Sequence, residues 1–279
     1  MGNKFTEAEA AKLAPAEIRR LIRNGDWTGP DEIACLGYWK ANLAVVPADW
    51  AYEFLLFAQR NPQPCWVSAA TDPGNPYPRQ LAADADVRTD LPRYRVFQEG
   101  KLIDEPTDIL KYWRDDLVAF FIGAVVNTTF VFQKANVKYR LIGGYTSNIP
   151  CVPAGRFHCS MAVTCSIFKS SYDAVRAIQI SSRYPDAHGA PVHIGSPSAI
   201  GIKDLAHPDI SNLLEAKNLQ HPEMLSLGFT VETGEVPMFW GAGVTPQLAA
   251  VAAKVPFMIT HYPACLFISD KLCEEFALL

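Results

Sequence analysis

The sequence predicts an α/β protein in which helices flank a layered mixed sheet, with a smaller α+β part. Three observations predict this class: apolar residues make up 49% of the 279 residues and charged residues only 19%, strand and helix periodicities alternate in the C-terminal half, and residues 66–150 are rich in turns. A chain of this length can bury a sizeable core. We therefore expect a main α/β domain from residues 1–65 and 146–279, and a smaller α+β part from residues 66–145.

Helix signals open the chain. Thr6 followed by Glu9 is a capping box, and Pro15 is a second start signal, so short helices are expected through Arg23. A further helix is expected over residues 49–59, because aromatic side chains recur there at helical spacing.

Strand signals dominate the following segment. Residues 66–68 resemble a strand, residues 93–97 alternate like one, and a turn at 99–100 leads into a partner at 101–103. The apolar run over residues 117–126 predicts a buried strand or helix segment. It is about half as long as a membrane span requires.

Strands and helices alternate in the C-terminal half. Strands are expected over residues 161–167, 236–240 and 257–261, the last of the chain, and helices over 170–182 and 245–254. A glycine turn precedes the final helix. A strand, glycine turn and helix in succession present free backbone amides, which favour an anion.

Composition excludes several classes of protein. The formal charge of −4, from 25 basic and 29 acidic residues without a basic stripe, disfavours nucleic acid as a partner. No secretory leader or membrane span is found, so we expect a cytoplasmic protein. Seven cysteines without metal-ligand spacing favour free thiols over disulfides or a zinc site, and nothing in the sequence calls for a metal or cofactor.

A histidine-containing loop is the strongest candidate for chemistry. His188 and His193 are separated by Gly189 and Pro191, so they cannot share a helix face and must lie in a loop or at a strand edge. Each imidazole alone could simply bind backbone carbonyls, whereas the pair favours a site. His261, at the end of the last expected strand, could converge with them.

Three arginines and one cysteine are further candidates. Arg60, Arg93 and Arg156 stand beside proline or glycine in rigid loops, where a guanidinium could bind a carboxylate or form a structural salt bridge. Cys151 could be a nucleophile or a packed, inert thiol. The glycine turn before the final helix does not match a nucleotide-binding pattern.

Many stretches, in order along nearly the whole chain, resemble the D-glutamate cyclase family of hydro-lyases. These stretches are Gly37-Tyr38, Ala41-Asn42-Leu43, Gln59-Arg60-Asn61-Pro62, Thr71-Asp72-Pro73-Gly74, residues 89–96, Asn148-Ile149-Pro150-Cys151, Pro153-Ala154-Gly155, residues 187–195, residues 236–247 and Ile259-Thr260-His261.

The resemblance implies a two-part α/β protein that dehydrates D-glutamate to 5-oxo-D-proline. Such a site must fix two carboxylates, take a proton from the ammonium and protonate the departing oxygen. We assign anion binding to Arg93 and Arg156, and acid/base work to His193 and His261. The full set of predicted site residues is His188, His193, His261, Arg60, Arg93, Asn148, Cys151, Arg156, Thr245 and Gln247.

Three positions depart from the family pattern. Thr129 stands where the family has a glutamate, Cys265 where it has a second histidine, and Lys40 where it has a glutamine. If the lost groups carry protons, about 10²–10⁴-fold in rate would be missing. Cys265 or Lys40 could substitute, in different chemistry.

Three functions therefore stay open. The first is a hydro-lyase or cyclase acting on a compact carboxylate such as D-glutamate. The second is a repurposed enzyme that cyclises, dehydrates or rearranges a larger, less polar metabolite, and the third is a non-catalytic binding protein. In each case the partner is a small molecule, and a homo-oligomer is compatible with the sequence.

Overall fold

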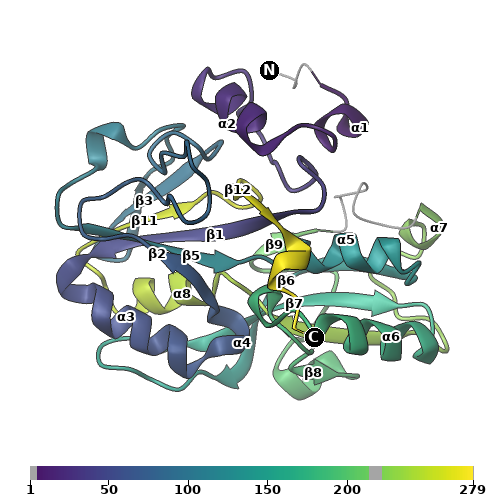
Figure 1. Cartoon of the computed structure of the whole chain (residues 1–279). Helices are drawn as coiled ribbons and strands as arrows, with labels where there is room; N and C mark the ends of the chain where they lie inside the picture. Colours follow the sequence, from purple (N-terminus) through teal and green to yellow (C-terminus); the bar gives the residue numbers. More distant parts are fainter. Residues whose placement is uncertain (1–4, 214–221, 279) are drawn as a thin grey trace.

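Two antiparallel β-sheets form the centre of the protein (Figure 1). The computed structural model describes residues 5–213 and 222–278. The seven-stranded sheet has the order β2 (Val67–Ala70), β5 (Leu117–Gly123), β1 (Tyr38–Pro47), β11 (Phe257–His261), β3 (Tyr94–Gln98) and β4 (Lys101–Asp104), with β12 (Phe267–Leu272) also paired to β1. The five-stranded sheet has the order β8 (His193–Ile194), β10 (Val236–Gly241), β7 (Ser160–Phe168), β6 (Tyr139–Pro150) and β9 (Ser211–Asn212).

The mixed α/β class is confirmed, but the arrangement of the strands differs from the prediction. Every strand pairing within the described parts of the chain is antiparallel, so the expected mixed sheet is wrong. Alternation of helices and strands predicted the elements, but it does not by itself fix strand direction. Two further corrections concern β12, which follows the strand expected to be the last, and β6, where no strand was predicted.

The helices begin close to the residues that their start signals predict. The Thr6 amide donates to Glu9 Oε2 at 2.8 Å, which confirms the capping box, and Ser170 caps α6. The helices are α1 (Glu7–Ala10), α2 (Pro15–Arg23), α3 (Ala48–Arg60), α4 (Pro62–Cys65), α5 (Val126–Lys134), α6 (Ser171–Ser181), α7 (Pro222–Leu225) and α8 (Thr245–Ala252).

The main core lies where the two sheets, α3 and α8 meet. Alternation along β1 places Ala44 and Val46 in this core and Leu43 and Val45 in a second core on the opposite face. Residues 66–145, predicted as a smaller part, contribute β2 and β5 to the same sheet as β1. The division into two domains stays a prediction.

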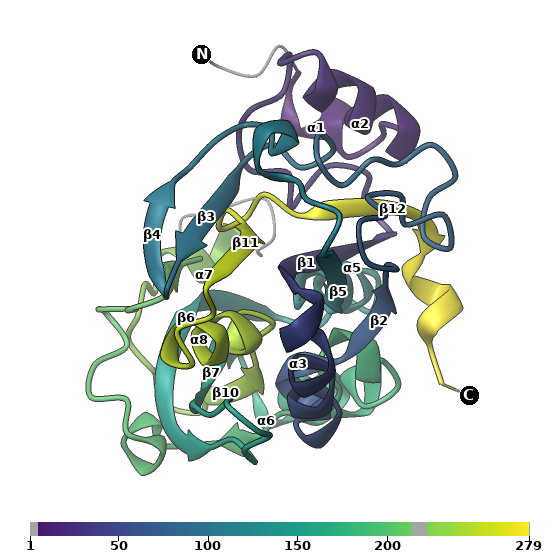
Figure 2. The same cartoon turned by 90° about the vertical axis from the view of Figure 1, so that its left-hand side faces the viewer.

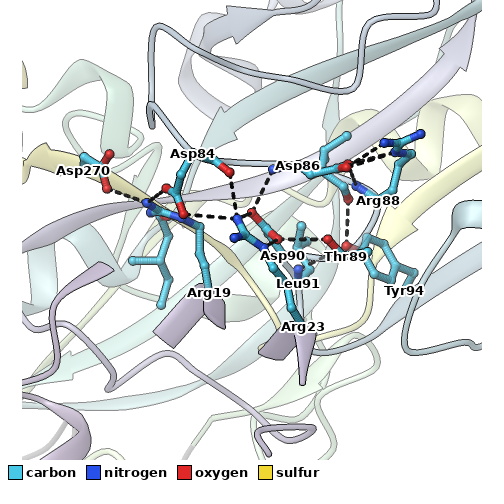
Figure 3. Close-up of polar contacts among 12 residues, drawn as sticks. Arg19, Arg23, Asp84, Asp86, Arg88, Thr89, Asp90, Leu91, Tyr94 and Asp270 are labelled. Carbon is cyan, nitrogen blue, oxygen red and sulfur yellow. Dashed lines mark hydrogen bonds and ion pairs between the residues drawn. The ribbon is translucent and has the colours of Figure 1, made fainter. Parts of the chain in front are cut away.

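Ion pairs fasten α2 to the body of the protein (Figure 3). The buried Arg19 guanidinium binds Asp84, Asp270 and the Ile268 carbonyl, and Arg23 forms two hydrogen bonds of 2.5 and 2.6 Å with the Asp90 carboxylate. In Figure 2, α1 and α2 lie together above β12. This attachment fixes residues 5–37, which form one wall of the cavity described below.

The Arg23→Met variant tests this attachment. Asp90 has a fully buried side chain, so loss of its charged partner should cost about 1.5–3 kcal/mol of unfolding free energy. Urea unfolding measures the loss. Arg20→Met, an exposed position on the same helix, is the control and should stay within about 0.5 kcal/mol of the wild type. Equal stability of the two variants would contradict the account.

Candidate active site

A cavity of about 540 Å³ lies where the N-terminal segment meets β1, the end of β11 and the turn before α8. Its polar lining includes Asn42, Thr164, His188 and His261. Its size falls within the roughly 300–1,000 Å³ of small-molecule sites. The cavity therefore brings together two of the three histidines that the sequence singled out.

His261 is held at a break along one edge of β1. Along this edge Ala44 pairs with β11, and Ala41 pairs with β12. Leu43 lies between these two pairings, and its backbone amide donates a hydrogen bond to His261 Nδ1 at 3.1 Å. The Gln247 side-chain amide lies 2.9 Å from the same nitrogen. Because a backbone N–H can only donate, Nδ1 accepts, and the proton of the neutral ring lies on Nε2.

His188 has the opposite tautomer. It follows a 3₁₀ turn over Pro185–Ala187 with a φ of 77°, and its Nδ1 lies 2.9 Å from the Gln63 carbonyl oxygen. Since a carbonyl only accepts, Nδ1 carries the proton. Its Nε2 is buried without a hydrogen-bond partner, and it therefore keeps a free lone pair.

Burial keeps both rings neutral. It lowers the pKa of His188 and of His261 to about 4 in each case, although contacts with the Gln63 and Leu43 carbonyl oxygens oppose the shift. At neutral pH the cavity thus presents one imidazole as a proton acceptor and one as an N–H donor. The two rings therefore differ in which nitrogen carries the proton, and not in their charge.

Two helix N-termini also face the cavity. Residues 124–126 begin α5, residues 243–244 precede α8, and both stretches line the cavity. Neither terminus has a side-chain cap. The Asn127 amide donates to the Ala124 carbonyl and the Thr245 amide to the Ala242 carbonyl, so the amides left to face a ligand are those of residues 124–126 and 243–244. Gly243 is required there, because a Cβ would lie 2.1 Å from Asn42 Nδ2. Two uncapped helix N-termini in one cavity favour an anion.

Glu32 is a lining residue that the sequence analysis missed. It lies in the loop between α2 and β1, far along the chain from both histidines, and no motif marks it. Burial raises its pKa to about 7, and Lys40 opposes that shift. The only hint in the sequence is its place between Pro30 and an apolar stretch.

The third predicted histidine and two predicted polar contacts lie outside the cavity. His193 is on the edge strand β8, where its Nε2 lies 2.8 Å from the Ser196 carbonyl oxygen. Asn148 is exposed on β6, and Cys151 is buried beside Cys159.

The three predicted arginines are held by partners elsewhere in the protein. The pairs are Arg60 Nη1 with the Pro153 carbonyl at 2.6 Å, Arg93 Nη2 with Glu105 Oε2 at 3.3 Å, and Arg156 Nε with Glu53 Oε2 at 3.0 Å. No lysine or arginine from the described ranges lines the cavity. Anion binding there would depend on backbone amides.

The remaining predicted residues do not line the cavity. Gln247 orients His261, and Thr245 Oγ1 accepts from the Ala162 amide. Thr129 and Cys265 are buried, as is Lys40, whose pKa is lowered by burial.

Within residues 5–213 and 222–278, no three histidine, cysteine or acidic side chains are grouped to hold a metal ion. In the same ranges, no helix is long and apolar enough to cross a membrane.

Comparison with known proteins identifies the family. The family model described as D-glutamate cyclase matches residues 118–270, more than half of the chain. The chain belongs to the D-glutamate cyclase family. This confirms the resemblance that the sequence stretches indicated.

Three relatives of this D-glutamate cyclase family member are each described as a "Putative hydro-lyase". A "Putative hydro-lyase" of Bacillus licheniformis is 44% identical over 96% of this chain and 98% of its own length. Proteins with the same name from Thermoanaerobacter and Bacillus subtilis are 44% and 41% identical, over 95% and 96% of this chain and 96% and 100% of their own lengths. A solved nitrogen repressor-like protein from Methanococcus jannaschii aligns over 93% of this chain and 99% of its own, with a TM-score of 0.37 and 9% identity, too low to support an argument.

Proposed function

We propose that the cavity is the active site of a hydro-lyase that cyclises a small carboxylate such as D-glutamate, giving 5-oxo-D-proline and water. One observation carries this proposal. Two neutral imidazoles with opposite tautomers and two uncapped helix N-termini line the same cavity. The family membership and the names of the relatives agree with it.

The helix N-termini would hold the substrate by its carboxylates. Backbone amides at residues 124–126 and 243–244 supply donors and positive potential without a cationic side chain. Asn42, whose Nδ2 donates to the Gly123 carbonyl at 2.9 Å, has its amide oxygen left for the substrate ammonium. Holding both ends of glutamate would bring its nitrogen to the γ-carbon.

The two imidazoles would then act on opposite sides of the reaction. His188 Nε2, with its free lone pair, accepts a proton from the ammonium so that the amine can attack the γ-carboxyl group. His261 donates its Nε2–H to the oxygen on which negative charge develops, as a neutral imidazole can. In this proposal His188 replaces His193 as the partner of His261, and backbone amides replace Arg93 and Arg156.

An NMR time course with D-glutamate tests the proposed function. We expect the purified protein to convert D-glutamate into 5-oxo-D-proline, and to leave L-glutamate unchanged if the carboxylates are fixed as described. Folded protein that forms no product from D-glutamate would contradict the proposal.

A second candidate is cyclisation or dehydration of a larger, less polar metabolite. The apolar side chains of Phe5, Trp27 and Ile33 line the cavity, and its volume of about 540 Å³ would leave room beside glutamate. If D-glutamate gives no product, carboxylates with an apolar substituent are the next substrates to test. A non-catalytic binding protein would bind such compounds and release them unchanged.

A further inference from the structure

The proposed reaction needs a proton donor, and before the substrate reacts neither histidine holds a proton that it can transfer. His188 Nε2 has no proton to give. His261 carries one on Nε2, but its Nδ1 already accepts from the Leu43 amide, so loss of that proton would leave a ring anion. A separate acid would protonate the departing oxygen while His188 remains at the substrate nitrogen.

Glu32 has the position that such a group requires. It is the one acidic side chain from the described part of the chain that lines the cavity. Its loop is fixed to the opposite wall, because the Asp31 amide donates to the Ala264 carbonyl at 3.0 Å and Asp31 Oδ1 accepts from the Leu266 amide at 2.7 Å. Ala264 and Leu266 also line the cavity, so the loop is held directly against it.

The Glu32 carboxyl is not occupied by a structural contact. It forms no hydrogen bond or salt bridge with any residue in 5–213 or 222–278, although it is half-buried among Phe5, Trp27 and Ile33. Four other carboxylates near α2 behave differently, since each is bound to arginine: Asp84, Asp86, Asp90 and Asp270 (Figure 3). An unpaired, half-buried carboxyl facing a cavity is typical of a group that acts on a ligand.

We propose that Glu32, in its protonated form, is the catalytic acid that protonates the departing oxygen. This inference rests on the proposed function. Glu32 would thus supply, from a different part of the chain, the acid that the family pattern has at the position of Thr129.

The surroundings of Glu32 favour its protonated form. Burial raises its pKa to about 7, and the charge of Lys40 on β1 opposes this shift. The other titratable groups nearby are Asp31 in the same loop and Cys265 in the loop after β11. Burial raises the pKa of both of these groups.

The proton balance closes without any other reactant. The substrate nitrogen loses two protons and forms the N–C bond, while the γ-carboxylate oxygen gains two protons, breaks from carbon and leaves as water. His188 takes each proton from nitrogen, and Glu32 gives each proton to oxygen. After each transfer the His188 imidazolium returns its proton to the Glu32 carboxylate, so both groups end as they began.

The test compares Glu32→Gln with Glu99→Gln, an exposed control in the turn between β3 and β4. We expect Glu32→Gln to lower kcat by about 10²–10⁴-fold with little change in KM. Glu32→Asp should restore part of the activity, and Glu99→Gln should match the wild type. In the wild type, kcat/KM should fall as the pH rises through about 7, because the acid must be protonated. In the Glu32→Gln variant, kcat/KM should not fall as the pH rises through about 7.

Two outcomes would overturn the inference, and they are distinguishable. A Glu32→Gln variant that has wild-type kcat, or whose kcat/KM still falls as the pH rises through about 7, would show that Glu32 is not the catalytic acid. The proposed function would not be affected by that result. A wild type that forms no product would instead refute the proposed function itself, and the role of Glu32 with it. Circular dichroism of each variant shows that it is folded before either conclusion is drawn.

Discussion

The His188→Asn variant should lose about 10²–10⁴-fold in kcat while remaining folded. Asparagine tolerates the left-handed backbone at this position, where φ is 77°, and its side-chain N–H can replace the Nδ1 donor to the Gln63 carbonyl. It has no atom in place of Nε2, so only the proposed base is removed. Initial rates of 5-oxo-D-proline formation and thermal unfolding measure the two effects.

A matched control separates loss of the base from loss of any histidine. His207→Asn changes an exposed histidine that pairs with Asp204 and does not line the cavity, and it should retain wild-type kcat. A folded His188→Asn variant that reacts as fast as His207→Asn would exclude His188 as the base.

The Glu235→Ala variant should be destabilised by about 3–5 kcal/mol. Arg140 on β6 and Glu235 before β10 form an ion pair whose side chains are 0% and 5% exposed, with Nη1 2.5 Å from Oε1. Removal of the carboxylate leaves a buried guanidinium without its counter-charge. Urea unfolding at neutral pH measures the loss.

The Arg140→Met/Glu235→Met double variant is the control for this pair. It removes both charges at once, so it should lose less stability than Glu235→Ala. Burial disfavours the charged form of Glu235, but its hydrogen bonds with Arg140 hold its pKa below the ordinary value. The stability from that shift should therefore be present at neutral pH and lost as the pH falls through the folded pKa. A single variant as stable as the double variant would contradict this account.

Local signals predicted most of the elements. The capping box at Thr6, the helical spacing over residues 170–182 and the alternation in β3 each depend on residues a few positions apart, and each coincides with the expected helix or strand. Strand β6 was missed because Gly143 and Gly144, together with Pro150, favour turns. These glycines instead allow close approach of β9, since a Cβ at Gly143 would lie 2.6 Å from the Ser211 carbonyl oxygen.

The site was predicted only in part, because its members are far apart in the chain. His188 and His261, which the sequence singled out at a rigid loop and at a strand end, both line the cavity, and their roles stay predictions. The arginines were predicted to bind an anion because the sequence does not show which residues pair with them. In the structure Arg156, for example, pairs with Glu53 on α3. Glu32 has no local signal, because only folding of the N-terminal segment brings it to the cavity.

The most direct test of the proposed site is ¹⁵N NMR of the histidine side chains during titration with 5-oxo-D-proline. At neutral pH the account predicts a neutral His188 with its proton on Nδ1 and a neutral His261 with its proton on Nε2. Addition of the product should shift both sets of signals and leave those of His207 unchanged. Signals of His188 and His261 that do not respond, or that show protonated rings in the free protein, would contradict the account.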